Sequence, residues 1–100
     1  MTTEELITKV AKRVVELRLT PIAIVLLESA KPLSFIGSQV LVFFQPIVTS
    51  ILPLNSYEEF IKILEERNNL EKLIQSIEKE ENERELKKIR YKKVKENGKR

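Results

Sequence analysis

Residues 21–54 read PIAIVLLESAKPLSFIGSQVLVFFQPIVTSILPL, and they form the most hydrophobic part of this 100-residue chain. Two apolar runs, at about 21–31 and 38–52, are separated by a polar stretch that contains Pro32. Proline disfavours helical backbone at the residue before it, so Pro32 is expected to end the first helix. The polar residues after Gly37 can begin the second helix. The interruption is therefore predicted to connect two very apolar helices.

Neither apolar run is long enough to cross a membrane, because a spanning helix needs about 20 apolar residues. A single span through both runs would place Glu28 and Lys31 in hydrocarbon, which costs a few kcal/mol for each charge. Two interpretations stay open. The helices are buried in the core of this chain, or they contact a lipid surface or a partner protein, because a small chain has few elements to cover helices that are apolar all round.

The contact interpretation identifies a set of candidate residues in and around the interruption. They combine a charge pair at the predicted end of the first helix with small polar and aromatic side chains. The candidates are Glu28, Lys31, Pro32, Ser34, Phe35, Gly37, Ser38, Gln39, Phe43 and Phe44.

Residues 2–19 have apolar side chains at helical spacing. Thr2 and Glu5 fit a capping box, in which each side chain bonds the backbone N–H of the other residue. A helix packed on the rest of the domain is the favoured interpretation. The alternative is a basic amphipathic helix that lies on a membrane.

Further helix boundaries follow from proline and from capping residues. Thr20 is expected to be the N-cap of the first apolar helix, with proline at its first helical position. Pro46 is expected to kink or split the second apolar helix. Ser56 and Glu59 form a second predicted capping box, and Asn68 is a predicted start of another helix.

These signals predict an all-α fold with four or five helices. Glycine occurs only twice, which disfavours a turn-rich β fold. Residues 1–77 are expected to form a helical domain, and residues 78–100 a charged helical or disordered tail, because the apolar pattern fades after Ile77.

Composition argues against catalysis. The chain has no cysteine and no histidine, and all 15 acidic residues are glutamate. It therefore lacks the commonest general base, the best nucleophile and the usual zinc ligands. We expect no enzyme activity, no metal, no cofactor and no small-molecule substrate. The abundance of Lys, Glu and Ile is also typical of heat-adapted proteins, although it equally favours helices.

Charge is divided sharply along the C-terminal half. Residues 56–83 contain nine Glu and four Lys or Arg, a net charge of −5, whereas residues 84–100 contain two Glu and nine Lys or Arg, a net charge of +7. This basic segment is interpreted as a solvated helix or disordered end, as an anionic-lipid anchor, or, least favoured, as a nucleic-acid contact. The candidate anionic-surface residues are Lys87, Lys88, Arg90, Lys92, Lys93 and Lys95.

The run LLESAKPLSFIGSQVLVFFQPIV, followed by YEEFIKILEERNNLEKLIQSIE, resembles small bacterial proteins of unassigned function that share an ES-x-x-PLSF-x-GSQ core. The resemblance covers about residues 20–78. It implies that six positions of this core form one unit, and it implies no activity. They are Glu28, Pro32, Ser34, Gly37, Ser38 and Gln39.

The leading hypothesis is a small non-catalytic protein that associates with the cytoplasmic membrane face, or with a membrane complex, through residues 21–54. The basic tail would be an auxiliary anchor. The alternative is a soluble helical adaptor or homo-oligomer that buries residues 21–54 between chains. The N-terminus has no basic, apolar secretion signal, so we expect a cytoplasmic protein, peripheral on the inner face of the membrane.

Overall fold

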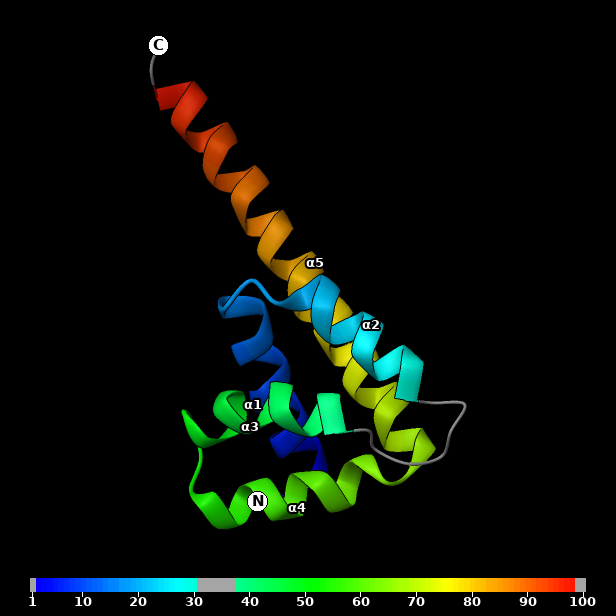
Figure 1. Cartoon of the computed structure of the whole chain (residues 1–100). Coiled ribbons are helices and arrows are strands. Elements are labelled where there is room, and N and C mark those ends of the chain that lie inside the picture. Colours follow the sequence, from blue (N-terminus) through cyan, green and yellow to red (C-terminus); the bar gives the residue numbers. More distant parts are fainter. Residues whose placement is uncertain (1, 31–37, 99–100) are drawn as a thin grey trace.

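The computed structural model describes residues 2–30 and 38–98, and its secondary structure in these ranges consists of α-helices (Figure 1). The predicted all-α class and the two apolar central helices are confirmed. The helices are α1 (Thr3–Glu16), α2 (Thr20–Ala30), α3 (Ser38–Thr49), α4 (Leu54–Leu64) and α5 (Arg67–Gly98).

The start of α1 follows half of the predicted capping box. The backbone N–H of Glu5 donates to Oγ1 of Thr2 over 3.1 Å. Glu4 and Glu5 lie in the first turn, where negative charge is stabilised by the positive end of the helix dipole. The apolar side of α1 is buried, so the interpretation as a core helix is confirmed.

The end of α1 is a Schellman turn. The N–H of Leu19 donates to the Val14 carbonyl and the N–H of Arg18 to the Val15 carbonyl, both over 3.0 Å. Arg18 takes the left-handed conformation with φ of 60°, at the position where glycine is commonest. The turn reverses the chain sharply, so α2 starts beside α5 rather than extending α1 (Figure 1).

The core lies between α1 and α5, which form the most extensive helix pair, and α2, α3 and α4 close it. Each apolar helix of residues 21–54 buries only one face. The inward face of α2 contains Ala23, Leu27 and Ala30, and that of α3 contains Val40, Phe44, Ile47 and Val48.

Of the two effects predicted for Pro46, a kink or a split of the second apolar helix, the split is wrong. The helix α3 continues through Pro46 to Thr49. Proline cannot donate to the Val42 carbonyl four residues earlier. Both Val42 and Pro46 are exposed, so that carbonyl lies on the solvent side of the helix, where water can replace the missing donor.

Three predicted helix starts need correction. The sequence predicts Thr20 as the N-cap of α2, but Thr20 is the first residue of that helix. Its hydroxyl contacts α5, and the Leu19 carbonyl accepts the first helical hydrogen bond. The helix α4 starts at Leu54 and not after Ser56, because Pro53, with φ of −61°, is its N-cap.

The helix α5 starts at Arg67, one residue before the predicted start at Asn68. The Leu70 N–H donates to the Glu66 carbonyl over 3.2 Å. The neighbouring Asn69 holds the corner, because its Nδ2 donates to the Ile63 carbonyl at the end of α4 over 3.0 Å.

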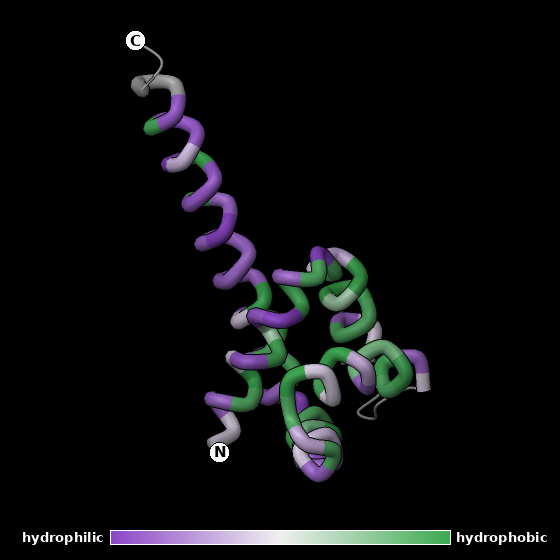
Figure 2. The backbone as a smooth tube through the Cα atoms, turned by 90° about the vertical axis from the view of Figure 1, so that its left-hand side faces the viewer, coloured by the Kyte–Doolittle hydropathy of each residue, from purple (hydrophilic) through white to green (hydrophobic). Residues whose placement is uncertain are grey.

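The helix α5 contains 32 residues and runs without interruption past residue 77, the expected domain boundary. Its first half packs on the other helices and its second half projects from them; Figure 2 shows this half as a mainly hydrophilic rod. The Cα radius of gyration is 15.6 Å, against about 13 Å for a compact domain of this length.

Candidate anionic-surface contact

The side of α5 that faces the globule changes from apolar to polar before the helix projects. Residues spaced alternately four and three apart lie on one face of a helix. On α5 this stripe begins with the buried side chains of Leu70, Ile74 and Ile77 and continues as Glu81 and Arg84.

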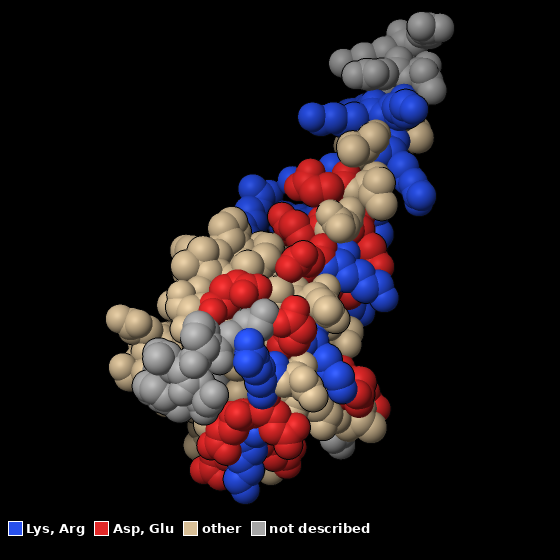
Figure 3. Space-filling model, turned by 90° about the vertical axis from the view of Figure 1, so that its right-hand side faces the viewer, with Lys and Arg blue, Asp and Glu red and all other residues tan. Residues whose placement is uncertain are grey.

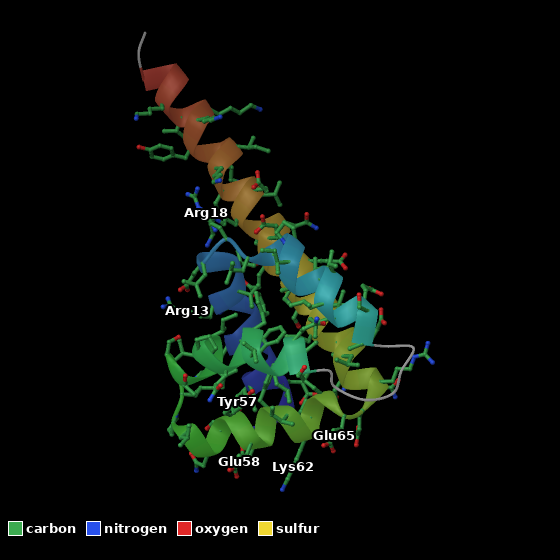
Figure 4. The ribbon with its side chains drawn as sticks, in the orientation of Figure 1. Arg13, Arg18, Tyr57, Glu58, Lys62 and Glu65 are labelled. Atoms are coloured by element: carbon green, nitrogen blue, oxygen red, sulfur yellow. The ribbon has the colours of Figure 1, made fainter. Side chains whose placement is uncertain are left out.

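The two polar residues of this stripe each form a hydrogen bond with the globule. Glu81 accepts a hydrogen bond from the Thr20 hydroxyl over 3.4 Å. Arg84 donates through Nη1 to the Val15 carbonyl at the end of α1. A guanidinium is favourable there because the C-terminal end of a helix is partly negative. Arg84 thus anchors the middle of α5 near the turn at Arg18, which is labelled in Figure 4 and lines one hollow with Arg84.

Residues 86–95 of α5, which we name the basic tip, are exposed and contain six Lys or Arg and no acidic residue. The Lys95 ammonium lies 5.4 Å from the centre of the Tyr91 ring, at the distance of a cation–π contact. The predicted anionic-surface residues all lie in the basic tip and are all exposed. They are Lys87, Lys88, Arg90, Lys92, Lys93 and Lys95.

The spacing of these charges is unfavourable for an isolated helix. Lys88 and Lys92 are four residues apart, and Lys92 and Lys95 are three apart. Like charges at these spacings destabilise a helix by about 0.2–0.5 kcal/mol for each pair. A negatively charged surface would remove this repulsion, so the tip is electrostatically suited to an anionic partner.

The candidate residues from the apolar region divide into three groups. Lys31, Pro32, Ser34, Phe35 and Gly37 lie outside the described residues. Glu28 is exposed on α2, and Ser38 and Gln39 are exposed at the start of α3.

Phe43 and Phe44 pack inside this chain rather than presenting a free aromatic surface. Phe43 is half-buried, and its ring and that of Phe44 are nearly perpendicular, in an edge-to-face contact with centres 5.0 Å apart. Phe44 is 1% exposed and lies 5.5 Å from the Phe60 ring of α4. Phe44 is therefore a core residue, and its expected role as a contact residue is corrected.

Sequence reasoning did not single out two apolar residues on the outward face of α2. Ile22 is 54% exposed and Val25 is 63% exposed. They lie on the opposite side of α2 from Ala23 and Leu27, which are fully buried. The uniform hydrophobicity of PIAIVLL gives no periodic signal that separates the inward from the outward face, so only the packing reveals them.

Charge is segregated along the 55 Å length of the molecule. Figure 3 shows mainly basic residues towards the projecting end and a group of mainly acidic residues near the opposite end, with acidic and basic residues mixed between them. At the acidic end, Glu58, Lys62 and Glu65 point outward from α4 (Figure 4).

The described ranges contain no cluster of acidic, histidine or cysteine side chains that could hold a metal ion. Burial raises the pKa of Tyr57, whose hydroxyl donates to the Leu41 carbonyl of α3 over 2.8 Å. A neutral phenol held in this way links α4 to α3 and has a structural role.

Comparison of the chain with models of protein families, with curated proteins and with solved structures gives no match. Among the helices described, none combines the length and the apolar character that crossing a bilayer requires.

Proposed function

We propose that this chain is a non-catalytic protein that binds an anionic membrane surface through the basic tip of α5. The observation that carries this proposal is the projection of six basic side chains, without an acidic neighbour in the tip, away from the globule. Each Lys or Arg held near an anionic membrane contributes about 1 kcal/mol.

The packing of residues 21–54 changes the relative importance of the two expected membrane contacts, which are this apolar region and the basic tail. Leu27 of α2 and four large apolar side chains of α3, Val40, Phe44, Ile47 and Val48, are buried in the core of this chain, so they are not free to enter lipid. Electrostatic attraction by the basic tip is therefore the main contact in this proposal, and the outward apolar side chains of α2 are auxiliary. The sequence predicts the opposite order of importance, in which residues 21–54 make the main contact and the basic tail is an auxiliary anchor.

The test compares two variants that each lose six positive charges. In the first, the six basic residues of the tip become Gln, which keeps a high helix propensity. In the control, six exposed basic residues of the globule and of the packed half of α5 become Gln, so that the net charge is the same. The control positions are Lys9, Lys12, Lys62, Arg67, Lys72 and Lys79.

Flotation with vesicles of anionic or neutral lipid measures binding. If half of the tip charges face the surface, the tip variant should bind anionic vesicles on the order of 100-fold more weakly at low salt. The control should bind within about threefold of the unmodified chain. Equal binding of the two variants, or binding of the unmodified chain that is unchanged in high salt, would contradict the proposal.

A second candidate function is association with a protein partner or a second copy through residues 21–54. The exposed side chains of Val42, at 70%, and Leu54, at 71%, favour it, because burial of such groups stabilises an interface. Sedimentation equilibrium over a range of concentrations distinguishes the cases: Val42→Ser should dissociate an oligomer formed in this way and leave a monomer unchanged.

A further inference from the structure

The basic tip has two sides, and the contacts of α5 identify which side faces which neighbour. Lys87 lines a shallow hollow with Lys12 and Glu16, so it lies on the α1 side of α5. Lys88 lines another hollow with Pro21 and Glu85, so it lies on the α2 side.

The α2 side of α5 changes sign along its length. Glu81, Glu85, Lys88 and Lys92 are spaced four, three and four residues apart, so they form one stripe along the helix. Glu81 bonds to Thr20 of α2, which places this stripe on the α2 side of α5. Lys88 and Lys92 also line one hollow of the tip, together with Arg84, Lys87 and Tyr91. We name Lys88 and Lys92 the near pair, because they point in the direction in which α2 lies from α5.

Arg90 and Lys93 point away from α2, and we name them the far pair. At about 100° for each residue, the mean direction of the far pair differs from that of the near pair by about 150°. Both pairs are exposed, and each carries two positive charges. They therefore provide a matched comparison in which only the direction of the charges differs.

The outward face of α2 supplies the apolar part of the same side. Ile22 and Val25 are exposed there, and Pro21 connects them to the hollow that Lys88 lines. The outward face of α2 stands about one helix diameter, 10 Å, beyond the surface of α5. A lysine side chain spans part of this step, and at physiological salt a charge acts over a further distance of about 8 Å.

Resting on the proposed function, we infer that the protein binds an anionic lipid bilayer with the α2 side of α5 towards the lipid. In this orientation Ile22 and Val25 enter the membrane interface, and the near pair faces the lipid headgroups. The apolar side chains favour a bilayer over a nucleic acid, because a phosphate backbone offers no apolar region for them. Charge complementarity and the adjoining apolar face thus point to one occupant.

The test uses the full-length chain and vesicles that contain phosphatidylserine. Lys88→Gln with Lys92→Gln should weaken binding about 30-fold at low salt, whereas Arg90→Gln with Lys93→Gln should weaken it less than about threefold. Val25→Ser should weaken binding by a similar factor at low and at high salt, because apolar insertion is not screened. Circular dichroism checks that all variants keep the helix content of the unmodified chain.

The outcomes separate this inference from the function on which it rests. Equal losses from the two pairs would overturn the orientation and leave the anionic contact of the tip intact. Loss from neither pair would overturn both proposals. Binding to duplex DNA that depends on the near pair, without binding to vesicles, would overturn the bilayer as the occupant. Unchanged binding of Val25→Ser would overturn the insertion of α2.

Discussion

Replacing Arg84 with methionine removes the contact through which α5 holds the end of α1. Methionine keeps the length and the helix propensity of the side chain, so the change is confined to the guanidinium. The lost hydrogen bond is charge-assisted, and such bonds contribute about 1.5–3 kcal/mol to stability. The Val15 carbonyl keeps a second donor, the N–H of Arg18, so the lower half of this range applies.

Loss of the favourable interaction with the helix dipole adds about 0.3–1 kcal/mol. The total is about 2–3 kcal/mol, which lowers the midpoint of thermal unfolding by about 8–24 °C in a domain of this size. Thermal unfolding followed by circular dichroism measures it. Lys87→Met is the matched control, because it removes an exposed charge at the same end of the globule and should change stability by less than about 0.5 kcal/mol.

The reasoning is refuted if Arg84→Met and Lys87→Met unfold within about 2 °C of each other. That result would mean that the contact with Val15 contributes no more than an exposed positive charge. It would also move the anchored part of α5 back towards Glu81, whose bond to Thr20 would then be the last contact before the projection.

Three further predictions concern stability. Phe44→Ala should destabilise the chain by about 3–5 kcal/mol in urea unfolding, since its ring is buried against Phe60; a loss below about 1 kcal/mol would show that Phe44 is not a core residue. Arg18→Gly should raise stability by up to about 1 kcal/mol, because glycine takes positive φ without strain; a destabilised variant would contradict the Schellman geometry. Because burial raises the pKa of Tyr57 above its unfolded value of about 10, its contribution to stability is complete below pH 10 and is lost as the pH rises through the folded pKa. Tyr57→Phe should therefore lose less stability than the unmodified chain between about pH 9 and pH 11, and parallel losses would refute the shift.

Local signals in the sequence predict the helices well where neighbouring residues decide the structure. Thr2 caps α1 as expected, because the bond to the N–H of Glu5 joins residues three apart. Ser56 fails as a cap, although its pattern is equally good, because Pro53 already begins α4 one turn earlier. A competing signal nearby is thus enough to shift a boundary.

The sequence predicts which basic residues belong to the candidate site, but it does not predict how they are placed relative to the other helices. The basic residues of the tip are recognisable from charge alone. The link between Arg84 and Val15 joins residues 69 apart, and no periodic pattern specifies which carbonyl a guanidinium will reach. The outward position of Val25 likewise depends on which face of α2 meets the core, and a uniformly apolar segment does not encode that choice.

Because α5 is continuous, the direction in which the basic tip points depends on the number of residues between the tip and the packed part of the helix. Between Arg84, which is fixed to α1, and Lys88, no turn or hinge interrupts the helix. One residue inserted after Glu85 would rotate the tip by about 100° and advance it by about 1.5 Å, without altering its charge or the packed globule. Seven inserted residues would return it to within about 20° of its original direction, some 10 Å further out. The direction of the tip is therefore kept only by insertions close to a whole number of helical turns, whereas its charge is kept by an uncharged insertion of any length.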